Sequence, residues 1–206
     1  MKEIKIKMVI AGDPGVGKTS ILRQYNNKQF VKSYSATIGV DFAKLNISYS
    51  NDIYNLYIWD TSGQDKFKFM THSFYKNITA ALVMYDITSK QSLMNTINWI
   101  DDIKDISKQC YIFLVGNKID LESHRQVKEQ DLDTVLNVMK ISPVRTIECS
   151  CKENINIKEL FDKIVQTINE DITLGILKSE KDNGLTVYKN KCLIERNDKK
   201  GCCIIL

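Results

Sequence analysis

The chain lacks the features that mark several large classes of protein. No apolar run is long enough to cross a bilayer and no signal peptide is recognisable, so we expect neither a membrane-spanning helix nor export. No internal repeat or low-complexity stretch is present. The net charge of +4 is small and most of it lies near the C-terminus, so we expect no binding to nucleic acid.

Disulfide and zinc patterns are also absent from the sequence. Cys110, Cys149, Cys151 and Cys192 show no paired C-x-x-C spacing and have no histidine nearby. We interpret these four cysteines as packing residues of a protein that works in a reducing compartment.

The composition provides enough apolar sequence for one complete core. The 206 residues are 43% hydrophobic and 26% charged, which suits one domain followed by a tail. Strand-like runs alternate with helical stretches, and this order predicts a doubly wound α/β sheet. Residues 42–49 and 53–59 flank a turn and predict an antiparallel hairpin. The apolar stripe of residues 157–168 predicts a helix, with Asn156 as N-cap and Glu159 completing a capping box.

Residues 12–19, Gly-Asp-Pro-Gly-Val-Gly-Lys-Thr, match the phosphate-loop pattern G-x-x-x-x-G-K-[ST] at every fixed position. A predicted strand (residues 4–10) precedes them and a predicted helix (residues 21–25) follows. Backbone N–H groups of such a turn close around phosphate oxygens, and the helix N-terminus adds partial positive charge. Lys18 can reach the outer phosphates, and the Thr19 hydroxyl can bind Mg²⁺. The predicted phosphate-binding residues are Gly12, Gly15, Val16, Gly17, Lys18, Thr19 and Ser20.

A second motif indicates which base is bound. Asn117-Lys118-Ile119-Asp120 follows a buried strand predicted at residues 111–115. The Asp120 carboxylate can accept hydrogen bonds from the ring N–H and the amino group of guanine, while Lys118 can lay its stem along the base. Adenine would leave that carboxylate unpaired, which is costly. The two motifs together predict GTP or GDP as the ligand.

With these motifs the chain resembles the Ras superfamily of small GTPases, and within it the Rab family. The resemblance covers residues 5 to about 170 and the C-terminus, and further motifs that carry it are residues 37–42, 58–65, 84–88 and 150–152. Ile-Gly-Val-Asp-Phe after Thr37, and Trp59 before Asp-Thr-Ser-Gly-Gln, resemble Rab rather than Ras or Rho. Ala36, the C-terminal motif and residues 177–185 are most similar to the Rab branch numbered eighteen. The resemblance implies a P-loop NTPase fold, with a mostly parallel six-stranded sheet and one antiparallel edge strand.

The family resemblance also implies the remaining site roles. Thr19, Thr37 and Asp60 would hold Mg²⁺, the Gly63 N–H would meet the γ-phosphate, and Gln64 would orient the attacking water. Release of the γ-phosphate would free both switch loops. The implied guanine-binding residues are Phe30, Asn117, Lys118, Asp120, Ser150, Cys151 and Lys152, although a core role is the alternative for Phe30.

Pro14 departs from the family pattern, and it leaves alternatives open. Proline fixes φ and has no N–H, and here it stands beside the expected position of the attacking water. We therefore expect a GTPase with slow intrinsic turnover, and we keep a poorly hydrolysing GTP-bound scaffold as an alternative. A Ras-like signalling GTPase is a nearer alternative. A nucleoside kinase also uses a phosphate loop, but the switch motifs and the N-K-x-D turn argue against it.

The last 32 residues predict a second function. We expect residues 1–174 to form the GTPase domain, and residues 175–206, with 7 Lys/Arg against 4 Asp/Glu, to form a flexible tail. Cys203-Ile-Ile-Leu206 is a C-a-a-X motif for geranylgeranyl, and Cys202 is a natural second lipid site. We expect a monomer on the cytoplasmic face of intracellular membranes that cycles with the cytosol and regulates vesicle trafficking. The expected partners are an exchange factor, a GTPase-activating protein, effectors and a prenyl-dependent escort protein.

Overall fold

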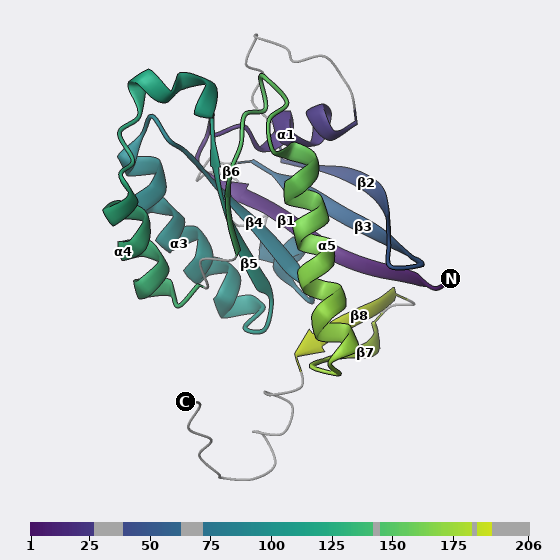
Figure 1. The fold of residues 1–206 in the computed structure, drawn as a ribbon. Helices are drawn as coiled ribbons and strands as arrows, with labels where there is room; N and C mark the ends of the chain where they lie inside the picture. The colour runs from purple at the N-terminus through teal and green to yellow at the C-terminus, as the bar shows by residue number, and fades with distance from the viewer. Residues whose placement is uncertain (27–38, 63–71, 142–144, 183–184, 191–206) are drawn as a thin grey trace.

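The structure, a computed structural model, describes residues 1–26, 39–62, 72–141, 145–182 and 185–190. Side chains are described as far as Leu177. Helices and strands alternate along the chain, as the sequence predicts (Figure 1). The elements are β1 (Glu3–Gly12), α1 (Lys18–Tyr25), β2 (Val40–Tyr49), β3 (Asp52–Thr61), η2 (His72–Tyr75), β4 (Ala80–Asp86), α3 (Lys90–Ile106), β5 (Tyr111–Asn117), η3 (Ile119–His124), α4 (Glu129–Met139), β6 (Thr146–Glu148), α5 (Ile157–Thr173), β7 (Leu177–Asp182) and β8 (Leu185–Asn190).

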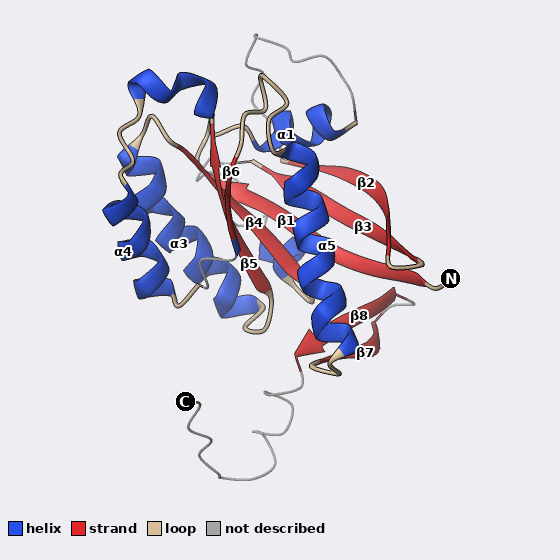
Figure 2. Cartoon of the chain, viewed as in Figure 1, coloured by secondary structure: helices blue, strands red, loops and turns tan. Residues whose placement is uncertain are grey.

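Six strands form one twisted sheet in the order β2-β3-β1-β4-β5-β6 (Figure 2). Four neighbouring pairs are parallel, and only the edge strand β2 runs antiparallel to its neighbour β3. Ser50 and Asn51, with φ of 49° and 67°, make the tight turn of the predicted β2–β3 hairpin. The predicted six-stranded sheet with one antiparallel edge strand is therefore confirmed.

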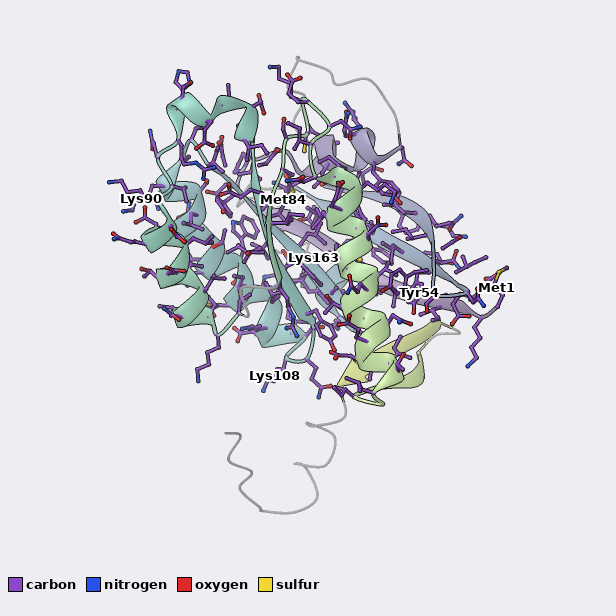
Figure 3. All side chains as sticks on the ribbon, in the orientation of Figure 1. Met1, Tyr54, Met84, Lys90, Lys108 and Lys163 are labelled. Carbon is purple, nitrogen blue, oxygen red and sulfur yellow. The ribbon has the colours of Figure 1, made fainter. Side chains whose placement is uncertain are left out.

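Helices cover both faces of this sheet and give three layers (Figure 1). One face packs against α1 and α5, and the other against α3 and α4. All six apolar stripe residues predicted for the last helix are buried. Met84 lies in the middle of the molecule, whereas Lys90 and Lys108 lie on its surface (Figure 3). The layers leave the carboxyl edge of the sheet to loops.

The predicted capping box at the start of α5 is wrong. Asn156 does occupy the N-cap position, but its backbone is left-handed (φ 59°) and its side chain makes no cap hydrogen bond. Its amide Nδ2 instead donates to the carbonyl of Glu148 at 2.7 Å. This hydrogen bond, between residues eight apart in the sequence, connects the start of α5 to the end of β6.

β7 (Leu177–Asp182) and β8 (Leu185–Asn190) pair antiparallel, and the sequence analysis does not predict this pair of strands. β8 lies against β1, and β7 against α5 (Figure 1). The boundary expected after residue 174 stays a prediction. Among the described residues, no helix combines the length and apolar character needed to cross a membrane.

Candidate functional site

The predicted site residues gather at the carboxyl edge of the central sheet. Gly12 ends β1, Asp60 is the last residue but one of β3, and Asn117 ends β5. Because β1, β3, β4 and β5 are parallel, their carboxyl ends meet at one edge, which is where open α/β sheets bind ligands. The phosphate loop and the N-K-x-D turn are thus brought together from opposite halves of the chain.

Two glycines let the phosphate loop lie close to its neighbours. Gly12 has φ of 135°, and a Cβ there would lie 2.3 Å from the carbonyl oxygen of Met84. Gly17 has φ of 105°, and its Cβ would lie 2.1 Å from Nδ2 of Asn117. Neither position has room for a larger residue, and both need a backbone conformation that favours glycine. The loop therefore needs glycine for its contact with β4 and for its contact with the base-side loop.

Lys18 is buried inside the phosphate loop. Its ammonium Nζ donates to the carbonyls of Gly12 at 2.7 Å and Asp13 at 2.8 Å. Burial lowers the pKa of Lys18 to about 8, and the charges of Asp60 and Asp13 oppose that shift. A buried cation held against the loop in this way suits a phosphate group.

Thr19 and Asp60 form the candidate magnesium site. The Thr19 hydroxyl donates to Oδ2 of Asp60 at 2.5 Å. Oδ1 of the buried Asp60 has no hydrogen-bond partner among the residues that the structure describes. Burial raises the pKa of Asp60, whereas the bond from Thr19 and the charge of Lys18 lower it. A hydroxyl and an unsatisfied carboxylate oxygen are the hard oxygen ligands that Mg²⁺ prefers, so these residues fit the ion.

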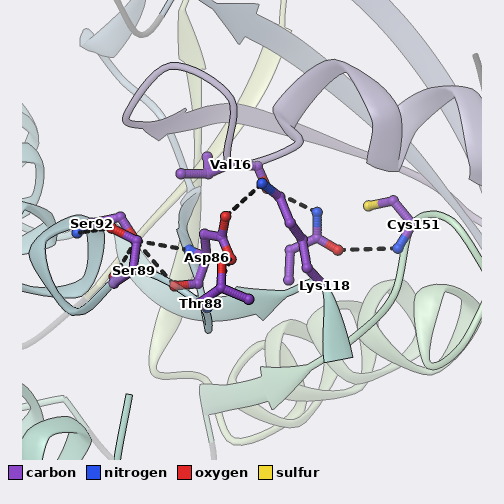
Figure 4. A network of polar contacts seen from close by, with 8 residues as sticks. Val16, Asp86, Thr88, Ser89, Ser92, Lys118 and Cys151 are labelled. Carbon is purple, nitrogen blue, oxygen red and sulfur yellow. Dashed lines mark hydrogen bonds and ion pairs between the residues drawn. The ribbon is translucent and has the colours of Figure 1, made fainter. Parts of the chain in front are cut away.

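Asn117 links the phosphate side of the site to the base side. Its Nδ2 donates to the carbonyl of Val16 at 2.8 Å, and its Oδ1 accepts from the backbone N–H of Cys151 at 3.0 Å (Figure 4). The side chain is 3% exposed. Both ends of the amide are therefore engaged within the protein, and the first effect of Asn117 is to hold two loops at a fixed distance.

Asp120 is oriented for a ligand by the loop that follows β6. The Ser150 hydroxyl donates to Oδ1 of Asp120 at 2.6 Å, and the N–H of Glu153 donates to that hydroxyl oxygen at 3.0 Å. Lys152 Nζ lies 3.7 Å from Oδ2 of Asp120. Ser150 and Lys152, which the sequence proposes as base-binding residues, thus contact Asp120.

Two residues that sequence reasoning left without a role support Lys118. Its ammonium pairs with Oδ2 of Asp86 at 2.5 Å (Figure 4). Oδ1 of Asp86 accepts from the N–H of Thr88 at 2.8 Å and from its hydroxyl at 2.7 Å. The turn at Asp86 has a local signal, because an aspartate side chain often accepts from the N–H two residues later, but the ion pair with Lys118 has none.

Arg125 is a further residue that the motifs do not reveal. Its guanidinium makes two hydrogen bonds to Glu148, at 2.8 and 2.7 Å, and two more to Glu122. These bonds raise the pKa of Arg125 above its usual value. Since Glu148 lies two residues before Ser150, Arg125 braces the loop that orients Asp120.

Other predicted residues lie outside the part of the chain that the structure describes. They are Phe30, Thr37, Gly63, Gln64, Cys202 and Cys203. Their roles stay predictions, and so do the ligand contacts assigned to Gly12, Gly15, Val16, Gly17, Lys18, Thr19, Ser20, Asp60, Asn117, Lys118, Asp120, Ser150, Cys151 and Lys152.

Comparison with known proteins agrees with this arrangement. The Ras family model matches residues 7–170. Ras-related protein Rab-12 of Rattus norvegicus is 33% identical over 184 residues, which is 89% of this chain and 75% of the relative. Ras-related protein RABA6a of Arabidopsis thaliana is 34% identical over 179 residues, which is 86% of this chain and 76% of the relative. Ras-related protein Rab-11C of Dictyostelium discoideum is 34% identical over 167 residues, or 81% and 73%. None of these carries the branch number expected from the tail, and that assignment stays a prediction. The chain belongs to the Ras family and, within it, to the Rab small GTPases.

Proposed function

We propose that this GTPase is a membrane-anchored switch, which recruits effectors when it holds GTP and releases them after hydrolysis to GDP. The observation that carries the proposal is the group formed by Lys18, Thr19 and Asp60 at the carboxyl edge of the sheet. It places a buried cation beside two hard oxygen ligands at the start of a helix. That combination suits a Mg²⁺–polyphosphate and little else.

The residues of the chain divide the work of hydrolysis. The loop N–H groups and Lys18 bind the β- and γ-phosphates, while Thr19 and Asp60, with Thr37, hold Mg²⁺. The ion supplies charge neutralisation on the transferred phosphoryl group. Gly63 and Gln64 position the attacking water. The motif loops offer lysines as their only cations, so a partner protein supplies any catalytic arginine and intrinsic turnover is slow, on the order of 10⁻⁴ s⁻¹.

Specificity for guanine follows from the held geometry of Asp120. Ser150 and Lys152 fix its carboxylate before a ligand arrives. Guanine offers two donors to a fixed carboxylate, and adenine offers no matching pair. A site built around a polar partner rejects an analogue that lacks it by about 10⁴-fold or more.

A surface cluster of aromatic side chains supports effector recruitment. Phe42 is 51% exposed, and its ring lies 5.3 Å from Trp59 and 6.2 Å from Tyr57 between ring centres. Trp59 in turn lies 6.4 Å from Phe74. The cluster joins β2, β3 and η2, and these elements border both predicted switch segments in the sequence. Exposed aromatic groups of this kind are typical of protein-binding surfaces.

The C-terminal sequence supports an anchor on the cytoplasmic face of an intracellular membrane. Lipids on Cys202 and Cys203, next to Lys199 and Lys200, would give the two signals that stable anchoring needs. An escort protein that shields the lipid would let the protein cycle through the cytosol.

The test of the switch is single-turnover GTP hydrolysis by the Mg²⁺-loaded protein, alone and with a Rab-activating domain. We expect slow turnover, acceleration by the domain, and loss of that acceleration in Gln64→Leu. Tight GTP binding without acceleration, and without an effect of the substitution, would instead indicate a long-lived GTP-bound scaffold.

The test of the anchor is flotation of the geranylgeranylated protein with vesicles that contain anionic lipid. We expect the protein with both cysteines to float after treatment with the prenyl transferase. The same treatment of a variant in which Cys202 and Cys203 are both replaced by serine should give no flotation. Equal flotation of both proteins would refute the anchor and leave the GTPase result unaffected.

A further inference from the structure

The middle of α3 holds the phosphate loop through one side chain. Trp99 Nε1 donates to Oδ1 of Asp13 at 2.9 Å, and Asn95 Nδ2 donates to Oδ2 at 2.7 Å. Gln91 Nε2 donates to Oδ1 of Asn95 at 2.7 Å, so the Asn95 amide has its donor end turned to Asp13. We call the two bonds to the Asp13 carboxylate the Asp13 contact.

The main chain of Asp13 is held as firmly as its side chain. Its carbonyl accepts one of the two hydrogen bonds from Lys18 at 2.8 Å. The next residue is Pro14, which restricts the residue before it to extended conformations. A shift of Asp13 would therefore move a carbonyl that Lys18 contacts and the first residue of the turn around the phosphates.

We propose that Asn95 and Trp99 are positioning residues of the phosphate loop, which act through Asp13 on Lys18 and do not touch the nucleotide. The inference rests on the proposed function of the loop as the phosphate site. Neither residue belongs to a nucleotide-binding motif, and they stand 82 and 86 residues from Asp13 in the sequence. Their effect should appear in nucleotide retention and in hydrolysis.

The donors and acceptors of the Asp13 contact allow a reciprocal exchange. Trp99 Nε1 can only donate a hydrogen bond. In the single variant D13N, the new amide oxygen accepts from Trp99, so the new amide N–H₂ faces the N–H₂ of Asn95. Two donors then face each other and one hydrogen bond is lost. A carboxylate at position 95 beside Asp13 brings two like charges together. In the double variant D13N/N95D, the new amide at position 13 accepts from Trp99 and donates to the new carboxylate at position 95. Gln91 still donates to the other oxygen of that carboxylate. Both bonds return with the same net charge.

The experiment measures release of a fluorescent GDP analogue and single-turnover GTP hydrolysis for the full chain with Mg²⁺. Loss of a hydrogen bond to a charged group should make release about tenfold faster in D13N and in N95D. W99F, which removes the donor together with the five-membered ring of a buried indole, should release GDP about threefold faster or more. The double variant should return to within about twofold of the unmodified protein. D101N, which removes one charge from an exposed position of the same helix, is the matched control and should release GDP at the unmodified rate.

A contact that only stabilises the fold gives a different result. It would lower the unfolding temperature of the single variants and leave the release rate unchanged, and that outcome overturns the proposal. Faster release in the single variants without recovery in the double variant overturns it too. If a single variant does not fold, W99F and the double variant still carry the comparison. If the unmodified protein fails to bind GDP, the proposed phosphate site is refuted rather than the Asp13 contact.

Discussion

Replacement of Asn117 by alanine should destabilise the fold and open the site together. The substitution removes one hydrogen bond to the Val16 carbonyl and one from the Cys151 N–H, both buried. A buried backbone group left without a partner costs about 1–3 kcal/mol, so the two together predict a loss of about 2–4 kcal/mol if water enters in part. The free energy of unfolding of such domains is about 5–15 kcal/mol, so the predicted loss is a large fraction of the total stability.

The assay is urea unfolding of the nucleotide-free protein, followed by tryptophan fluorescence, with the GDP release rate of the loaded protein measured in parallel. Because Asn117 connects the phosphate side with the base side, release should become faster even at urea concentrations where the variant is fully folded. Asn137→Ala, at an exposed position of α4, is the matched control and should change stability by less than about 0.5 kcal/mol. A loss below about 0.5 kcal/mol for Asn117→Ala would refute the reasoning, because water would then replace both bonds without cost.

Three further outcomes test other parts of the site. Burial lowers the pKa of Lys18 to about 8, and bound phosphate favours the ammonium, so GDP affinity should fall about tenfold per pH unit above about pH 8. The same titration on Lys18→Gln should be flat, and an equal slope in both proteins would assign the effect to another group. Chelation of Mg²⁺ by EDTA should speed GDP release in the unmodified protein and have little effect in Asp60→Ala; an equal response would remove Asp60 from the ion site. Arg125→Lys loses the paired hydrogen bonds to Glu148, which is partly exposed. The free energy of unfolding, measured in urea, should therefore fall by about 1 kcal/mol. A gain in stability would contradict the bracing role.

The single strands and the phosphate loop could be predicted because their signals are local, whereas the arrangement of the six-stranded sheet was implied by the family resemblance. Alternating apolar residues predict strands wherever they occur. The eight residues of the phosphate loop contain Gly12, Gly17 and Lys18 at the spacing that predicts its conformation. The β2–β3 hairpin was equally local, since its turn residues are adjacent.

The contacts that organise the base side could not be predicted in this way. The guanine contact of Asn117 stays a prediction, but the bonds from its amide to Val16 and from Cys151, which come from opposite ends of the domain, have no local signal in the sequence. Asn156 stands at the N-cap position, but its left-handed backbone makes no side-chain cap bond, and its Nδ2 donates to the carbonyl of Glu148 eight residues earlier. The partners of these polar side chains come close only in the folded chain, so the pattern of apolar residues along the sequence does not predict them.

We expect nucleotide retention and hydrolysis to be coupled in this chain, because adjacent residues of one loop act on both. Pro14 has no N–H to offer beside the expected position of the water, so we expect it to slow the chemical step. Asp13 acts through its carbonyl on Lys18 and so acts first on the bound phosphates. The proline also restricts the backbone of Asp13, whose carboxylate accepts hydrogen bonds from Asn95 and Trp99. A loop that is poorly built for rapid hydrolysis can therefore be well built for holding its nucleotide. A Pro14→Ser variant that hydrolyses GTP faster and also releases GDP faster would be the direct sign of that exchange.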